Sequence, residues 1–337
     1  GIEHTTLPQY GFQWHPERLN DNQTEISDWI ISPIFALNGN QRINFVQKLS
    51  SNSQLTHFPK IDVYVLNTDL MDYASEEDTS YFDYLTTIHD SNLETVIIPD
   101  TVTTIGDSAF NNCDGLTEVK LPDSVEYIGS YAFADCYSLS SVTNASARKI
   151  GESAFESTAI EKYNNDRIID TIDIYAFYNC TKLRQARIQA YTIHSNAFQY
   201  SGIESYYNNL TRYTYVEDST FESCPNLRYF KGKKVDYVGD SAFKNCPNLE
   251  KVVIGNLMGG ESQAFAYCPK LNKIYLGNTS AMPNNLAYDA FDGVSPEGTL
   301  YVYQNMLNAA ETFKDNYLPS DWVVESINEP IDYEYED

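Results

Sequence analysis

The stretch from Leu116 to Ser138 reads LTEVKLPDSVEYIGSYAFADCYS, and variants of it fill most of the 337-residue chain. Its most constant feature is a phenylalanine after a small residue, which recurs at intervals of 21 to 26 residues. A period in the low twenties is too short for two helices per unit and is typical of one strand plus a compact return. The repeated phenylalanines are Phe110, Phe133, Phe155, Phe177, Phe198, Phe221, Phe243, Phe265 and Phe291.

Each unit can be divided into a strand, a turn and a closing segment. Val119 and Leu121 alternate with polar residues, which indicates a strand with one buried face. Pro122 ends the pairing. Gly129 is expected to adopt backbone angles that are closed to other residues. Phe133 then points inward and closes the coil.

One coil cannot bury its own apolar face, so successive coils are expected to stack around a shared core. Each buried phenylalanine should contribute roughly 1.5 to 3 kcal/mol. Nine strands at about 4.8 Å spacing make a sheet roughly 40 Å long. The sequence therefore predicts a rod with a broad face and not a globule with a cleft.

The phrase L-x-x-V-x-I/L-P-x-x-V-x-x-I-G-x-x-A-F-x-x-C resembles the BspA-like leucine-rich repeats of bacterial surface proteins, from about Leu93 to Ile327. The resemblance implies an α/β solenoid: a right-handed leucine-rich-repeat coil of about nine repeats of 21–26 residues. Its strands would lie on the concave face, with a cap at each end. In coils three to six, Asp173, His194 and Glu217 replace the glycine and the proline is missing, so these coils are expected to be less regular.

The two ends of the chain differ from the repeats. Residues 1–90 show no clear repeat and are expected to form an N-terminal module or cap of uncertain fold before the solenoid at 91–298. Within this module the sequence favours a helix near Gln41 to Leu49, a strand at Ile61 to Leu66 and a helix near Tyr81 to Ile88.

After the solenoid, residues 299–328 are expected to form a strand–helix–strand cap. Apolar residues recur there at helical spacing between a strand at 299–303 and a strand at 322–327. Residues 329–337 form an acidic tail that is expected to be disordered. The helical residues are Met306, Ala310, Phe313 and Tyr317.

The formal net charge of −25 argues against general affinity for nucleic acid or anionic membranes. The chain has no apolar run long enough to span a bilayer. It begins with Gly1 and not Met, which we interpret, together with the family resemblance, as the mature form of an exported protein at the bacterial surface or outside the cell.

The six cysteines all stand three residues after a repeated phenylalanine, where other coils have Thr158, Ser201 and Val294. A position that accepts these residues requires a small side chain, so free and mostly buried thiols are expected. Disulfides between adjacent coils remain the alternative, although a ladder points the Cβ atoms in parallel. The cysteines are Cys113, Cys136, Cys180, Cys224, Cys246 and Cys268.

Motifs for catalysis, metal binding or cofactor binding are missing from the sequence. It has no zinc-protease spacing, phosphate-binding loop, dinucleotide fingerprint or nucleophile elbow. His194 replaces a turn glycine, which is more consistent with an exposed turn than with a site. We therefore expect no cofactor and no enzymatic activity. A catalytic site within residues 1–90 is the least favoured alternative.

The outward-facing strand positions differ in charge from the rest of the chain. They contain six basic residues and one acidic residue, against 16 basic and 46 acidic elsewhere. Lysine stems that simply cover the sheet are the structural alternative. Tyrosines accompany these lysines, a mixture that is typical of recognition surfaces. The predicted binding residues are Lys120, Lys162, Arg187, Tyr207, Tyr229, Lys231, Lys251, Lys273 and Tyr275.

Two binding functions follow from these observations. The resemblance implies a non-catalytic adhesion protein of the cell surface that engages a host or neighbouring-cell macromolecule, since BspA-like proteins bind extracellular-matrix proteins such as fibronectin and fibrinogen. The alternative is a surface protein that binds acidic glycans, for which the basic, tyrosine-bearing face is the motivation.

Overall fold

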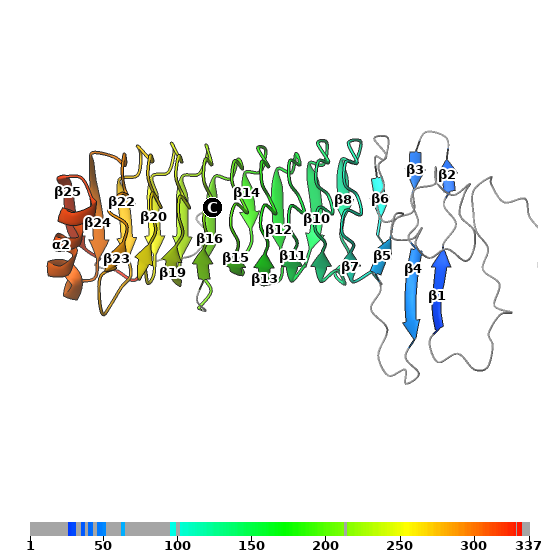
Figure 1. Cartoon of the computed structure of the whole chain (residues 1–337), viewed down its shortest axis with the longest axis horizontal. Helices are drawn as coiled ribbons and strands as arrows, with labels where there is room; N and C mark the ends of the chain where they lie inside the picture. Colours follow the sequence, from blue (N-terminus) through cyan, green and yellow to red (C-terminus); the bar gives the residue numbers. More distant parts are fainter. Residues whose placement is uncertain are drawn as a thin grey trace, which may run out of the picture.

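The computed structural model describes residues 95–98, 102–211, 214–327 and 329–331, apart from a few side chains, and the backbone of five strands between residues 26 and 64. The described coils stack along one axis into a rod (Figure 1). A helix and a final strand lie at the end of the rod that follows the last coil. None of the described helices is long and apolar enough to cross a bilayer.

The first sheet contains the strands that the repeat pattern predicts. Its 11 members run parallel in the order β25-β24-β22-β20-β18-β16-β14-β12-β10-β8-β6. Its first strands are β6 (Thr95–Ile97), β8 (Glu118–Lys120), β10 (Ser141–Ala145), β12 (Lys162–Asn165), β14 (Gln185–Arg187) and β16 (Ser205–Asn208). The others are β18 (Tyr229–Gly232), β20 (Lys251–Ile254), β22 (Lys273–Leu276), β24 (Glu297–Val302) and β25 (Asp321–Ser326).

A second sheet, which the repeat pattern did not predict, covers another side of every coil. It has 12 strands in the order β1-β4-β5-β7-β9-β11-β13-β15-β17-β19-β21-β23. Those within the repeats are β7 (Thr104–Ile105), β9 (Tyr127–Ile128), β11 (Lys149–Ile150), β13 (Ile169–Ile172), β15 (Ala190–Ile193), β17 (Thr214–Val216), β19 (Val235–Val238), β21 (Gly259–Gly260) and β23 (Asn285–Leu286).

The third side of each coil is the turn that contains the repeated phenylalanine. Ser108 and Asn112, two residues before and after Phe110, have φ angles of 54° and 59°. The same pair of left-handed positions recurs in the next seven coils, occupied by serine, asparagine, tyrosine, aspartate or glutamine. The Phe110 amide donates to the carbonyl of Ala132 in the next coil at 2.7 Å. Backbone hydrogen bonds therefore join the coils on this side as well.

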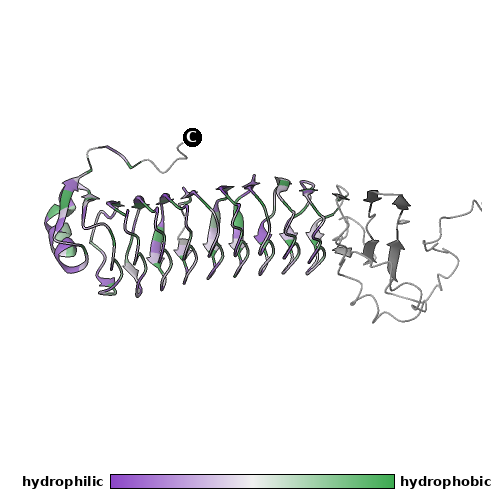
Figure 2. Cartoon of the chain, turned by 90° about the horizontal axis from the view of Figure 1, so that it is seen from above, coloured by the Kyte–Doolittle hydropathy of each residue, from purple (hydrophilic) through white to green (hydrophobic). Residues whose placement is uncertain are grey.

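The core is a continuous ladder of phenylalanine rings, as the period predicts. All nine repeated phenylalanines are buried. Neighbouring rings stack with centroids 5.0 to 5.3 Å apart. Figure 2 shows the coils stacked one after another along the rod, with hydrophobic and hydrophilic residues in each of them. The solenoid fold is thus confirmed.

The coils that depart from the repeat phrase show the expected irregularity in strand register, between β10 and β12 and between β17 and β19, but they keep the hydrogen bond at the glycine position. The Asp173 amide donates to the carbonyl of Ile150 at 2.9 Å, as the Gly151 amide does to that of Ile128 at 2.8 Å. The expectation that Gly129 needs unusual backbone angles was wrong, because its φ is not positive. A Cβ atom there would instead lie 2.6 Å from the Asp107 backbone nitrogen. Glycine is favoured by close packing between coils.

All six cysteines are free and buried, as predicted. The thiols also donate hydrogen bonds: Cys136 Sγ lies 3.0 Å from the Phe110 carbonyl oxygen of the preceding coil. Equivalent bonds recur from Cys180, Cys224, Cys246 and Cys268 to phenylalanine carbonyls. In most coils the position therefore holds a small side chain that can also donate, which explains its exchange with threonine and serine, whereas Val294 of the last coil keeps only the small size.

Strands replace the helix expected near Gln41 to Leu49. The backbone there forms β3 (Asn40–Arg42) and β4 (Val46–Ser51), and β3 pairs with β2 (Phe35–Leu37). β4 pairs with β1 (Ile26–Ile31) on one side and β5 (Asp62–Tyr64) on the other. A helix as short as the expected one is only marginally stable by itself, so the pairing of β4 on both of its edges overrides the local helical pattern.

β5 confirms the strand expected at 61–66, and it pairs with β7 of the first coil. The helix expected near 81–88 lies outside the described residues. That residues 1–90 form a cap stays a prediction.

The predicted strand, helix and strand follow the last coil. A short 3-10 helix, η3 (Gln304–Met306), leads into α2 (Leu307–Tyr317). In the chain, α2 follows β24 and precedes β25. Phe313 of α2 packs edge-on against Phe291, with ring centroids 6.3 Å apart. α2 therefore covers the last ring of the ladder. Of the acidic tail, only residues 329–331 are described.

Candidate functional site

The predicted outward residues occupy two straight rows on the 11-stranded sheet. Between β18 and β25, one row contains Tyr229, Lys251 and Lys273, joined strand to strand by direct register. The second row runs in register through Lys231, Val253, Tyr275, Tyr301 and Glu325. Side chains two residues apart on a strand share a face, so both rows project outward while the residues between them enter the core.

The sheet brings six of the nine predicted binding residues together and leaves three apart. Lys120, Lys162 and Arg187 are exposed on β8, β12 and β14. The other six lie on β16, β18, β20 and β22, which are consecutive strands. We call these six the lysine–tyrosine face: Tyr207, Tyr229, Lys231, Lys251, Lys273 and Tyr275.

Within this face, lysine ammonium groups lie over tyrosine rings. Lys231 Nζ is 5.3 Å from the ring centroid of Tyr207, and Lys251 Nζ is 5.1 Å from that of Tyr275. Tyr275 also stacks on Tyr301 of β24 at 4.2 Å. Burial, followed by the charge of Tyr301, raises the pKa of Tyr275. The contacts fix the positions of two ammonium groups on the sheet.

The centre of the face is covered, which the strand pattern did not predict. Lys231 is only 1% exposed and Tyr207 only 5%, although both lie on an outward row. Lys251 and Tyr275 are half-buried, and Lys273 is exposed. Lys231 therefore does not behave as a solvent-facing strand residue. Replacing it would change the stability of the protein as well as its binding.

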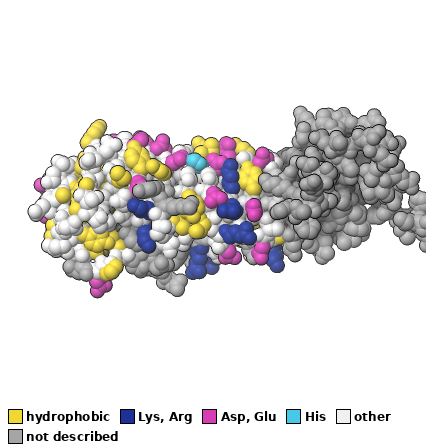
Figure 3. Space-filling model, turned by 90° about the horizontal axis from the view of Figure 1, so that it is seen from below, with side chains coloured by type: hydrophobic (Ala, Val, Ile, Leu, Met, Phe, Trp, Pro, Cys, Tyr) yellow, Lys and Arg dark blue, Asp and Glu magenta, His cyan; other side chains and the backbone are white. Residues whose placement is uncertain are grey.

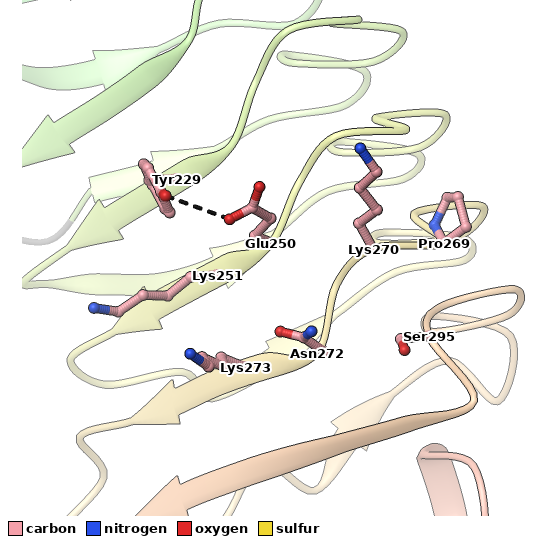
Figure 4. A pocket seen from close by; sticks show the side chains of 8 residues that line it. All are labelled: Tyr229, Glu250, Lys251, Pro269, Lys270, Asn272, Lys273 and Ser295. Carbon is pink, nitrogen blue, oxygen red and sulfur yellow. Dashed lines mark hydrogen bonds between the residues drawn. The ribbon is translucent and has the colours of Figure 1, made fainter.

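A pocket of about 560 Å³ lies along one edge of the face (Figure 4). Lys251 and Lys273 extend from neighbouring strands, and Lys270 extends from the turn before β22. The Lys251 and Lys273 side chains point the same way along their strands, whereas Lys270 points away from them and its ammonium donates to Asn248 Oδ1 at 2.6 Å. Three lysines therefore line one hollow from two directions. The complete lining is Tyr229, Glu250, Lys251, Pro269, Lys270, Asn272, Lys273 and Ser295.

The acidic residue in this lining is already paired. The Arg228 guanidinium donates two hydrogen bonds to the Glu250 carboxylate, at 3.0 and 3.2 Å, and the Tyr229 hydroxyl donates a third at 3.3 Å. Arg228 is the main cause of a lowered pKa for Glu250. The pocket is consequently positive in charge. It is suited to an anionic ligand such as a carboxylate or sulfate.

Sequence reasoning missed several members of this site. Tyr301 continues the outward row onto β24, so extending the repeat register by one strand would have found it. Lys270 and Ser295 stand in turns, where strand alternation gives no signal. Arg228 immediately precedes an outward tyrosine, and its guanidinium lies 5.0 Å from the ring of Tyr229.

The described part of the chain offers no support for a metal site. No group of three or more His, Cys, Asp or Glu side chains there could hold a metal ion. Figure 3 shows one side of the rod, where Lys and Arg side chains stand in several small groups among acidic and hydrophobic ones. Basic side chains are therefore local features of an acidic molecule.

Residues 86–204 and 191–295 match the model of the BspA type leucine rich repeat region, of which the family model finds six copies. This chain belongs to the BspA-type leucine-rich repeat family. Leucine-rich repeat proteins are generally non-catalytic binding scaffolds, and the family suggests a binding or adhesion role. Among curated proteins, none matches this chain.

Several solved structures are similar to this BspA-type chain. A leucine-rich repeat protein from Bacteroides ovatus is 16% identical, covering 87% of this chain and 100% of its own, with a TM-score of 0.31. A leucine rich cell surface protein from Faecalibacterium prausnitzii is 17% identical, covering 92% and 96%, with a TM-score of 0.43. The pneumococcal vaccine antigen PcpA is 14% identical, covering 88% and 100%, with a TM-score of 0.33.

Proposed function

We propose that this protein is a non-catalytic adhesion protein, exported and displayed on a bacterial surface, which engages a host or neighbouring-cell protein through the lysine–tyrosine face. The partner class is an extracellular-matrix protein, as the family resemblance implies. The face supplies cations and aromatic rings on a rigid sheet, and the partner supplies acidic segments.

One observation supports this proposal most strongly: lysines and tyrosines gather on four consecutive strands of a molecule whose net charge is −25. A positive patch within a negative body steers an acidic partner toward one place and repels it elsewhere. Tyrosine adds contact area at little cost in conformational entropy, which favours binding. Covering the sheet would require lysine stems alone, without the ordered rings beside them.

The proposal is tested by measuring binding of the purified protein to immobilised fibronectin and fibrinogen. We expect saturable binding that weakens as NaCl rises from about 50 to about 500 mM, because exposed charges are screened. Binding that is absent from both surfaces, or unchanged by salt, contradicts the proposed partner class.

The pocket favours acidic glycans as a second candidate. Lys251, Lys270 and Lys273 surround a hollow of about 560 Å³. Asn272 adds an amide there, and Tyr229 adds an aromatic ring. Such a site offers charge for a uronic acid or sulfate group and hydrogen bonds for sugar hydroxyls.

A glycan array distinguishes the two candidates. Binding to sulfated or uronic-acid glycans, lost in the K270Q/K273Q variant, supports the second candidate. An array without signal, together with retained binding to a matrix protein, removes it. Neutral glycans of the same length provide the control, since they lack the charge that the lysines would recognise.

A further inference from the structure

We propose that the acidic segment of this chain, residues 328–337, docks on the lysine–tyrosine face and occupies it until a partner displaces it. The sequence of the acidic segment is NEPIDYEYED, which holds five carboxylates, two tyrosines and no basic residue. Its role as a competitor rests on the proposed function. The docking itself requires no partner.

The register of the sheet places the start of the acidic segment beside the face. Ser326, the last residue of β25, lies in one row with Gly232 of β18, through Ile254, Leu276 and Val302. Lys231 immediately precedes Gly232, so the chain leaves the sheet within one residue of the Lys231 row.

The acidic segment is also long enough to cross the face. Four steps between strands, β25 to β24, β22, β20 and β18, separate its start from Lys231. At about 4.8 Å per step these steps span roughly 19 Å. Ten extended residues span roughly 33 Å. Carboxylates from Asp332 onward therefore reach β20 and β18.

The local chain direction agrees with this path. The Ile327 amide still donates to the Val302 carbonyl oxygen at 2.8 Å, so the strand pairing persists to this residue. Pro330 cannot extend it, because proline has no amide hydrogen. Glu329 and Pro330 are exposed and Ile331 is half-buried.

Burial along the second row follows the same path. Glu325 is exposed, Tyr301 and Tyr275 are half-buried, and Val253 and Lys231 are each 1% exposed. Carboxylates of the acidic segment, placed over β18 and β20, bring opposite charge close to Lys231 and Lys251, in addition to the contacts that these lysines make with the rings of Tyr207 and Tyr275.

The proposal is tested on the full chain by lysine labelling with acetic anhydride, read by mass spectrometry. The test variant is D332N/E334Q/E336Q/D337N, which keeps the length and shape of the acidic segment but removes four charges. We expect Lys231 and Lys251 to be acetylated about fivefold faster in this variant than in the unmodified chain. Lys149 and Lys244, on the other two sides of the coil, should be unchanged and are the internal control.

Carbodiimide cross-linking of the unmodified monomer provides a second measurement. We expect amide bonds between carboxylates of residues 332–337 and Lys231, Lys251 or Lys273. Equal labelling rates in the two chains overturn the proposal, and so do cross-links to Lys149 or Lys244 at equal yield. Cross-links that form only between two copies also overturn it. Because neither measurement uses a partner, failure here leaves matrix-protein binding to its own test.

Discussion

Side chains of unequal size alternate at one core position of the 11-stranded sheet. Tyr163 on β12 and Tyr206 on β16 stand on either side of Ala186 on β14. Tyr163 packs against Phe155 and Phe177. The small alanine leaves room for two rings at a position where most other coils have valine or isoleucine. The coils without the consensus residues thus remain packed.

The hydroxyl of Tyr163 is buried without a hydrogen-bond partner among the described residues. Leaving such a group unsatisfied costs about 1 to 3 kcal/mol. We therefore expect Y163F to increase the free energy of unfolding by about 1 kcal/mol, measured by urea denaturation. Y137F, which changes an exposed hydroxyl, should change it by less than about 0.5 kcal/mol. A destabilised Y163F variant contradicts this account of the core.

The buried thiols predict a loss of stability at high pH. Burial raises the pKa of Cys180 to about 12, against hydrogen bonds from Thr158 that lower it. The folded state therefore holds this proton more tightly than the unfolded state. The resulting stability is complete below about pH 9 and is lost as the pH rises toward 12.

At about pH 10.5 this thiol should have lost about 2 kcal/mol of its contribution. C180A removes the titrating group, so its free energy of unfolding should fall less between pH 9 and 10.5 than that of the unmodified chain. Urea denaturation at several pH values measures both slopes. If the free energy of unfolding falls equally with pH in both chains, the Cys180 thiol does not contribute to the pH dependence of stability.

At the scale of elements, α2 stabilises the end of the solenoid. Phe313 covers the Phe291 ring, and a repeat array loses stability locally when one interface is lost. We expect F313A to lower the free energy of unfolding by about 3 kcal/mol. Hydrogen exchange should accelerate in β24 and β25, while β8 to β12 remain protected. N308A, an exposed change on the same helix, should alter neither region, and uniform acceleration along the rod contradicts the local effect.

Some elements were predictable from the sequence and others were not, for physical reasons. The Phe110 to Phe291 period predicted the ladder, because only the core requires an aromatic ring at fixed spacing. Strands as short as β7, with two residues, show no alternation and were missed. The left-handed turn positions were missed because Ser108 and Tyr131 are not the usual signal for positive φ.

The candidate site was predicted only in part. Strand alternation identified the outward rows and hence Lys251, Lys273 and Tyr275. Alternation says nothing about what lies over a row, so the burial of Lys231 was missed. It also ignores turns, which is why Lys270 was not found. The helix near 41–49 was wrong because local propensity does not contain the pairing of β4 with its two neighbours.

At the scale of the whole molecule, the rod separates stability from recognition. The phenylalanine ladder and two sheets hold the coils together, and the exposed and half-buried members of the outward rows, Lys273, Lys251 and Tyr275, carry the proposed binding. A net charge of −25 repels acidic partners from most of the surface, so we expect the lysine–tyrosine face to determine where they bind. Charge at this face should therefore control affinity far more than charge elsewhere.

The most direct test compares two charge-reversed variants in binding to immobilised fibronectin and fibrinogen. K251E/K273E reverses two lysines of the face, and K149E/K244E makes the same change of charge on the other two sides of the coil. We predict that K251E/K273E binds about tenfold more weakly than the unmodified chain, with its thermal midpoint within about 2 °C, while K149E/K244E keeps its affinity. Equal affinities for the two variants would contradict the account.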